Sequence, residues 1–448
     1  MPLPPSSLCR FPCLGLVALL FVGLAGVALA ADAVPLDPLR WGLDLRLRNE
    51  YFDNALTLDD TAARHEQNYQ RYRARLWSSA DLNPSFTVNS RFVWESWEWD
   101  YPSYKAPNRD GWTWSDGMID QLNVTWKSSG KTPVQIVAGR QDIVLGDGWL
   151  VLDGTSTDGS RTTYFDALRI TVPLPGIKST VDCAYIDLEA YNENRLPAFN
   201  DQHKPMSEQD EHSAYLQFTN KSLANLMLES YLIFRDETRV VAAGDDGHIT
   251  TWGVRSVYDP TPHWQLKGEA ALQWGKLDTK DVQAWGFLGQ LAWNAKDTAG
   301  NQLRLALECL SGDDPGTARN EQFDITWGRY PRWSEIYALL YVPETRVAQY
   351  GNLVRFGPGW SVAPIKPVSV SLDYNALWAM ENNRGTASGL FRSSGNFRGH
   401  LVRSMVKYNI NPHLTATTLC EVLKPGNYYG PTKQGAAIFW RVELLFVF

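Results

Sequence analysis

Three arginines at alternate positions, Arg71, Arg73 and Arg75, are the residues with the clearest chemical potential. Side chains two apart on a β-strand share one face, and Tyr69 and Trp77 extend this face. Each guanidinium can hold a carboxylate through two parallel hydrogen bonds. Arginine cannot face lipid at low cost, because near the bilayer midplane of a barrel it costs about 2 to 4 kcal/mol. The spacing therefore predicts a water-facing wall that can interact with anions.

The same parity argument places further charged residues on the polar faces of other predicted strands. The candidate anion-contacting residues from parity are Arg46, Arg48, Arg71, Arg73, Arg75, Arg91, Arg255, Arg304, Arg355, Arg403 and Arg441. The accompanying inward acids are Asp44, Glu50, Glu95, Glu229, Glu269, Glu308, Glu421 and Glu443. In one interpretation these groups form ion pairs that stiffen the wall, such as Arg91 with Glu95 on one strand face. In the other, which we favour, arginines left over after pairing form a ring that selects anions.

Aromatic residues also occur on the polar faces, where a sugar ring could stack on them. Trp77, Trp97 and Tyr231 are the examples. For each one alone, the preferred interpretation is that it fills the pore or lies at its rim.

The element that best defines the fold is the last one, Ala436 to Phe448. One parity is apolar, from Ile438 and Trp440 onward, whereas the other carries Arg441 and Glu443. This alternation is typical of a strand with lipid on one side and water on the other, and the ending resembles the terminal signal of outer-membrane barrels. A soluble edge strand with such a face would promote aggregation.

The amino terminus predicts export. An apolar run, Leu14 to Leu29, follows Arg10 and ends in Ala28-Leu29-Ala30, so residues 1–30 are expected to be a signal peptide and 31–448 an outer-membrane β-barrel domain. No later segment approaches the about 20 apolar residues of a spanning helix. The 19 Trp suit interfacial girdles. A net charge of -7 gives no indication of nucleic-acid binding. The mature cysteines are expected to pack within strands: Cys183, Cys309 and Cys420.

The predicted fold is all-β: a closed, transmembrane, antiparallel β-barrel of 18 strands, with sixteen or twenty if a strand is merged or split. Tight turns alternate with long polar loops, and the longest loop, Ser311 to Tyr350, is expected to fold over or into the mouth. The predicted strands are Trp41–Phe52, Tyr69–Leu82, Phe86–Trp99, Met118–Lys127, Val134–Asp142, Thr162–Val172, Ser179–Leu188, His212–Asn220, Leu226–Asp236, His248–Asp259, Trp264–Leu277, Gln283–Ala295, Gln302–Leu310, Gly351–Val362, Val368–Ala379, Arg398–Asn409, Leu414–Leu423 and the terminal strand.

Two segments resemble the alginate export family of outer-membrane barrels. One contains Gly139-Arg140-Gln141, a Gly/Asp loop and then Phe165-Asp166-Ala167-Leu168-Arg169; the other is Leu310-Ser311-Gly312-Asp313-Asp314. The resemblance implies an 18-stranded channel with an electropositive constriction through which an acidic polysaccharide moves. It also adds Arg140 and Arg169 to the candidate residues. The family is broad, so alginate and other anionic glycans both stay open as permeants.

The expected function is therefore a porin that passes an anionic polysaccharide or oligosaccharide, with no cofactor or metal. A general or anion-selective nutrient porin is the alternative, and the direction of transport is not encoded. An outer-membrane enzyme is disfavoured because no Ser-His or Asp-His spacing is visible, and Asp313 and Asp314 are expected to cap a loop. The expected partners are the glycan, outer-membrane lipid, the barrel assembly machinery and periplasmic export or uptake proteins.

Overall fold

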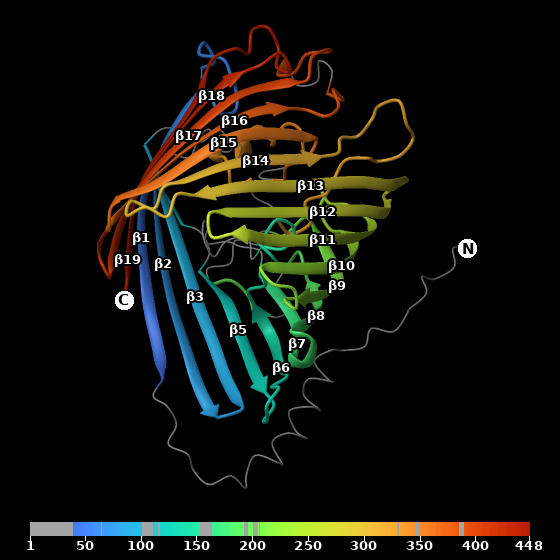
Figure 1. Cartoon of the computed structure of the whole chain (residues 1–448). Helices are drawn as coiled ribbons and strands as arrows, with labels where there is room; N and C mark the ends of the chain where they lie inside the picture. The colour runs from blue at the N-terminus through green and yellow to red at the C-terminus, as the bar shows by residue number, and fades with distance from the viewer. Residues whose placement is uncertain are drawn as a thin grey trace.

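The chain forms a closed antiparallel barrel (Figure 1). The computed structural model describes residues 39–63, 65–100, 111–114, 117–152, 164–191, 196–199, 205, 207–328, 331–345, 349–384 and 389–448. β1 pairs with β2 on one side and with β19 on the other, which closes the ring. The first nine barrel strands are β1 (Arg40–Asp53), β2 (Glu66–Asn83), β3 (Phe86–Trp99), β5 (Met118–Lys127), β6 (Gln135–Gln141), β7 (Phe165–Leu174), β8 (Ser179–Leu188), β9 (Gln209–Asn220) and β10 (Leu226–Arg239).

The second half continues the same meander. Its strands are β11 (Gly247–Thr261), β12 (Trp264–Leu277), β13 (Lys280–Asn294), β14 (Gln302–Leu310), β15 (Leu353–Ile365), β16 (Val368–Trp378), β17 (Phe397–Asn411), β18 (Leu414–Pro425) and β19 (Ala437–Val447). The predicted closed barrel of 18 strands is thus confirmed. The described residues add one short strand, β4 (Gly111–Trp114), where a loop was expected; it pairs with the last residues of β3.

The outer wall is apolar because each strand presents alternate side chains to it. On β19, Trp440 is 49% exposed and Phe446 38%, whereas Phe439 on the opposite parity is fully buried. Arg441 shares the inward parity with Phe439. The strand therefore has the lipid-facing and inward faces that its sequence predicts. The three described cysteines are free and lie in strands.

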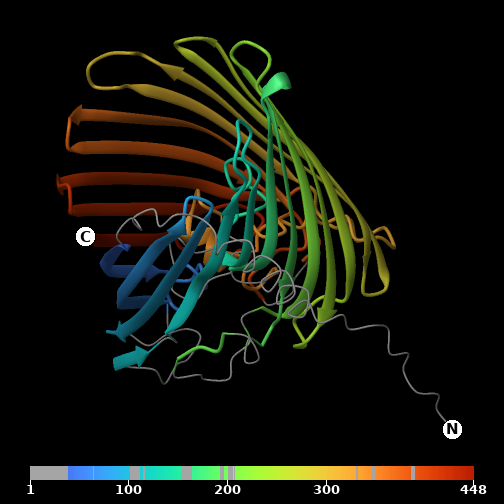
Figure 2. The ribbon, with the colours of Figure 1, turned by 90° about the horizontal axis from the view of Figure 1, so that it is seen from below.

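The two ends of the barrel differ in their connections. At the end where β1 begins and β19 finishes, here called the turn end, strands are joined by short turns; residues such as Lys178 and Asn225 adopt left-handed conformations there. At the opposite end, here called the loop end, most connections are long, although the β12–β13 turn at Asp278 is short. From below, the strands arch around an interior into which connecting segments project (Figure 2).

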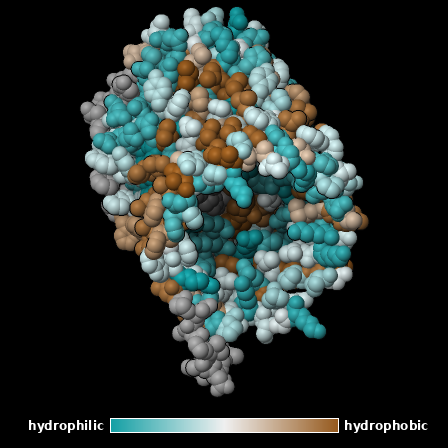
Figure 3. Space-filling model, turned by 60° about the vertical axis from the view of Figure 1, so that its left-hand side comes forward, coloured by the Kyte–Doolittle hydropathy of each residue, from teal (hydrophilic) through white to brown (hydrophobic). Residues whose placement is uncertain are grey.

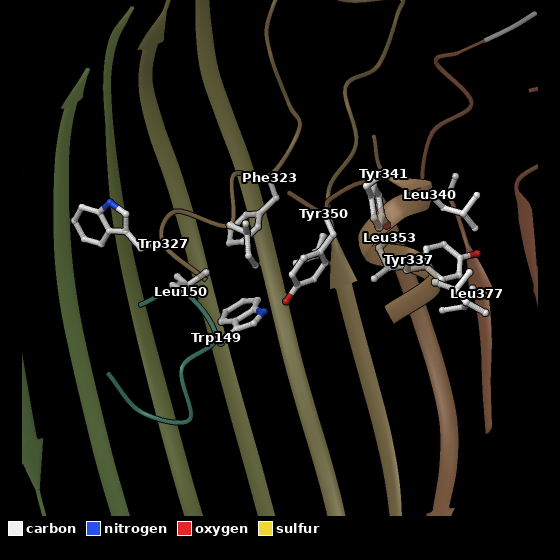
Figure 4. Packing of buried hydrophobic residues seen from close by; sticks show 14 of the residues in the cluster. Trp149, Leu150, Phe323, Trp327, Tyr337, Leu340, Tyr341, Tyr350, Leu353 and Leu377 are labelled. Atoms are coloured by element: carbon white, nitrogen blue, oxygen red, sulfur yellow. The ribbon is translucent and has the colours of Figure 1, made fainter. Parts of the chain in front are cut away.

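Two connections fold into this interior and meet there (Figure 4). The segment after β6 carries Trp149, which stacks on Phe323 from the β14–β15 loop with ring centroids 5.5 Å apart. The backbone of Trp327, also in that loop, donates to the Leu150 carbonyl over 2.9 Å. Helix α2 (Glu335–Leu340) lies in the same loop and is buried on most of its surface. The expectation that the long loop enters the mouth is therefore confirmed.

No helix in the described part of the chain combines the length and apolar character of a membrane-spanning helix. The expected signal peptide, residues 1–30, and the expected strand start at Thr162 lie outside the described residues.

Candidate functional site

The densest group of inward cations lies where the barrel closes. We call Arg46, Arg48, Arg71, Arg73, Arg75 and Arg441 the basic arc. The register places Arg48 opposite Arg71, Arg46 opposite Arg73 and Asp44 opposite Arg75. All six lie on the inward parity of adjacent strands β19, β1 and β2. The alternation in sequence is thus sufficient to bring them together, because neighbouring strands are in register.

Carboxylates on the same strands and on the adjacent strand β3 neutralise most of this charge. Arg48 pairs with Glu443 over 2.6 Å across the β1–β19 seam. Arg441 Nε donates to Glu50 over 2.8 Å, again across the seam. Arg71 lies 2.8 Å from Glu95 of β3, and its guanidinium lies over the Trp97 ring at 4.6 Å. These pairs connect β19, β1, β2 and β3.

Arg73 is held less closely by carboxylates than most residues of the arc. Its side chain is 3% exposed, and its ion pair with Asp44 is long, with Nη2 3.3 Å from the carboxylate oxygen. Neither Nε nor Nη1 has a hydrogen-bond partner among the described residues. Its cross-strand partners are another cation, Arg46 of β1, and Glu95 of β3. The Glu95 carboxylate forms its ion pairs with Arg71 and Arg46. A buried charge with incomplete hydrogen bonding is energetically costly.

The other candidate arginines found by parity each have an acidic partner. Arg91 binds Asp142 through both terminal nitrogens, at 2.8 and 2.9 Å, and Asp120 through Nε. The expected pair of Arg91 with Glu95 is therefore wrong, because Glu95 pairs with Arg71 and Arg46 instead. The remaining pairs are Arg255 with Asp147 and Glu229, Arg304 with Asp373, Arg355 with Glu308, and Arg403 with Glu421.

The first family-like segment has a structural role. Arg140 of β6 binds Asp166 of β7 through two hydrogen bonds of 2.9 and 3.0 Å, so the two halves of the motif are cross-strand partners. Gly139 has a φ of 115° and lies so close to the Leu122 carbonyl that a side chain would collide. Arg169 pairs with Asp182 over 2.8 Å. These residues hold the wall where the inserted segment leaves it.

Hydrogen bonds that the sequence does not reveal hold both connections in the interior: the β14–β15 loop, here called the inserted loop, and the segment after β6. Glu421 of β18 accepts hydrogen bonds from Ser334 Oγ (2.8 Å) and from the amides of Glu335 (3.0 Å) and Ile336 (3.2 Å), at the start of α2. Trp149 Nε1 donates to Glu308 over 3.1 Å. Because these acids also pair with wall arginines, the loop and the wall form one network.

Two buried arginines were missed as candidates. Arg235 pairs with Asp324 of the inserted loop over 2.8 Å, and its inward parity was the signal that could have found it. Arg398 binds Glu344 of the same loop over 2.7 Å. Its parity is opposite to that of Arg403, but a register irregularity and the positive φ of Gly399 turn it inward. Strand parity alone therefore assigns Arg398 to the outer face, which is why it was not among the candidates.

The three candidate aromatics have different surroundings. Trp97 stacks on Tyr69 at 5.2 Å, and Tyr231 is buried with its hydroxyl donating 2.8 Å to Glu269. Trp77 instead is 39% exposed and lines a cavity of about 400 Å³ toward the turn end, together with Arg75 and Arg91. The space-filling view shows a hollow with both hydrophilic and hydrophobic residues at its border (Figure 3).

Comparisons with known proteins agree with this architecture. The family model described as alginate export matches residues 37–438. A BenF-like porin from Pseudomonas fluorescens Pf-5 is similar in structure, with a TM-score of 0.59 at 11% identity over 92% of this chain and 99% of that one. OccAB2 of Acinetobacter baumannii gives a TM-score of 0.57 at 10% identity, covering 91% and 98%. No curated protein matches the sequence.

Proposed function

The chain belongs to the alginate export family and is a porin channel of the bacterial outer membrane, and from this premise we propose that its permeant is an acidic polysaccharide or oligosaccharide such as alginate. In this proposal the turn end faces the periplasm, as short turns do in outer-membrane barrels. The basic arc supplies the anion preference. Uronate carboxylates interact with guanidinium groups of the wall as the chain moves past.

One observation carries the proposal: Nε and Nη1 of the buried Arg73 lack hydrogen-bond partners among the described residues, and its Asp44 contact is 3.3 Å long. Apart from its neighbour Arg46, whose contact with Glu95 is 3.4 Å, the other candidate arginines have an acidic partner within 3.1 Å. A carboxylate reaching this guanidinium would supply the hydrogen bonds that its Nε and Nη1 lack. The remaining arginines of the arc keep the local potential positive enough to attract that carboxylate, while their acidic partners prevent it from being trapped.

Planar-bilayer recording tests this function. At low salt the wild-type pore should prefer chloride to potassium, and oligouronates should block it partially. The preference should decline at 1 M salt, where the Debye length is about 3 Å. A pore that prefers potassium at low salt, or one that oligouronates never enter, would contradict the proposal.

A general nutrient porin is the second candidate, and the near balance of inward arginines and carboxylates favours it. The two candidates differ in their response to chain length. A channel for a polymer should be blocked longer as the oligouronate lengthens, whereas a nutrient porin should respond to the monomer and lose sensitivity as the chain grows.

A further inference from the structure

Trp77 combines an inward position with a large exposed surface. It lies on the same parity of β2 as Arg73 and Arg75, is 39% exposed, and lines the turn-end cavity of about 400 Å³. That volume lies within the about 300 to 1,000 Å³ of ligand pockets. We propose that Trp77 is a stacking platform for one sugar ring of the permeant at the turn end, an inference that rests on the proposed function.

The residue opposite Trp77 on the neighbouring strand leaves space for the indole ring. Gly42 of β1 is the cross-strand partner of Trp77. A Cβ atom at Gly42 would lie 2.6 Å from atoms of the indole ring, so the absence of a side chain lets the indole lie against the backbone. The ring is thereby held in place from one side, while the exposed part of its surface adjoins the cavity. A held aromatic face loses little conformational entropy when it binds a ligand.

A second aromatic side chain in the barrel also packs over a glycine of the neighbouring strand, but its ring is buried. Tyr231 covers Gly253 of β11 in the same way, and a side chain at Gly253 would collide with the ring. Tyr231, however, is 5% exposed and its hydroxyl is bonded to Glu269. Covering a glycine therefore does not require an exposed ring, and the exposure of Trp77 calls for another explanation.

The polar groups around the cavity fit sugar hydroxyls. Arg75 Nε donates to Asp44 over 2.7 Å, which places a planar donor group and a planar acceptor group side by side. Gln121 also lines the cavity, and its amide has both donors and an acceptor. Asn89 lines it too, but its amide already bonds to Ser79 and Asn123. A pyranose ring presents an apolar C–H face to an aromatic ring and hydroxyls at its edge. The cavity supplies both kinds of partner.

Single-channel recording with oligouronates added at the turn end tests the platform. Trp77→Ala should shorten the mean block by about two- to twelvefold, which corresponds to the about 0.5 to 1.5 kcal/mol of an aromatic contact. Trp77→Phe should retain most of the block, and Gly42→Val should shorten it because the added side chain displaces the indole. Trp285→Ala is the matched control, since Trp285 is 44% exposed on the outer parity of β13.

A neutral probe separates this inference from the function on which it rests. Methyl-esterified oligouronates keep the sugar ring but lose the carboxylate, so their shorter block should still depend on Trp77. All four variants should keep the wild-type chloride preference and heat-modifiable migration. Wild-type block that Trp77→Ala leaves unchanged would overturn the platform alone, whereas a wild-type pore that neither probe blocks would overturn both proposals.

Discussion

Arg46 of β1 and Arg73 of β2 are direct cross-strand partners at the centre of the basic arc. Both are buried, and Glu95 contacts Arg46 over 3.4 Å whereas Asp44 contacts Arg73 over 3.3 Å. Like charges directly opposite each other destabilise a sheet. Glu95, which is the other cross-strand partner of Arg73, and Asp44 offset part of this repulsion, and an external anion would offset more of it.

Selectivity should depend on Arg73. Arg73→Gln should lower the chloride-over-potassium ratio about fivefold, because a unit charge at 4 Å contributes about 1 kcal/mol in water, and Arg73→Glu should weaken it further or reverse it. Reversal potentials in a salt gradient measure this. Lys221→Gln, the same charge change in an exposed turn, is the control. Unaltered reversal potentials in both Arg73 variants would show that this arginine is only an internal partner.

Glu421 should determine whether the inserted loop stays in place. Glu421→Ala removes the acceptor for the start of α2 and leaves Arg403 without its partner 3.1 Å away. Breaking a buried pair of this kind costs about 3 to 5 kcal/mol, so α2 should detach from the wall. We expect larger and noisier conductance and faster proteolysis within the loop. Thr417→Val, on the same face of β18, is the control and should behave as wild type. If Glu421→Ala showed the same conductance and noise as the wild type, Glu421 would not anchor the loop.

The β1–β2 loop should respond to pH through His65. The hydrogen bond from His65 Nδ1 to Asp53 Oδ1, 2.7 Å long, raises the pKa of the imidazole above 6.5. A raised pKa means that the pair stabilises the folded loop fully below about pH 6.5 and that this contribution is lost as the pH rises through the raised value. A histidine titration by NMR should show the shift, with His65→Gln assigning the signal. Asp53→Asn should return the pKa to its ordinary range, and a normal pKa in the wild type would refute the prediction.

The carboxyl-terminal residue should matter for assembly. The Phe448 amide donates to the Leu43 carbonyl over 2.8 Å, the Leu43 amide donates back over 2.9 Å, and the Phe448 ring lies 5.6 Å from Trp41. Deleting Phe448 removes two hydrogen bonds of about 0.5 to 1.5 kcal/mol each, and should reduce the heat-modifiable fraction in outer membranes. Phe448→Tyr keeps the ring and should assemble normally. Equal assembly of the deletion variant would show that the ending is dispensable.

The strands could be predicted from sequence because lipid and water impose a period of two on every one of them. Phe86–Trp99 and Ser179–Leu188 were predicted with the observed bounds. β4 was not predicted because its four residues, Gly-Trp-Thr-Trp, are too few to establish a period of two. Parity also placed the arginines correctly on the inner face, except where the irregularity near Gly399 reverses it for Arg398.

The partners of those arginines could not be predicted, because they depend on register and on loop positions. Arg91 and Glu95 share a face, but the acid that binds both terminal nitrogens of Arg91 is Asp142, beyond the end of β6. Glu421 similarly contacts α2, 86 residues away in sequence. Alternation within one strand contains no information about such contacts, so whether an arginine is paired or unsatisfied has to be read from the assembled barrel.

The ion pairs across the β1–β19 seam have a kinetic consequence. Arg48 and Glu443 are 395 positions apart, and Glu50 and Arg441 are 391 apart. Contacts this distant form late, because the ends of the chain must first be brought together. Until they form, two strand edges and several charges lack their partners, so every unfinished barrel lies well above the finished one in free energy. The ion pairs between β1 and β19 thus make membrane insertion close to all-or-none. A chain truncated before Arg441 should therefore be degraded by proteases instead of persisting as a leaky pore.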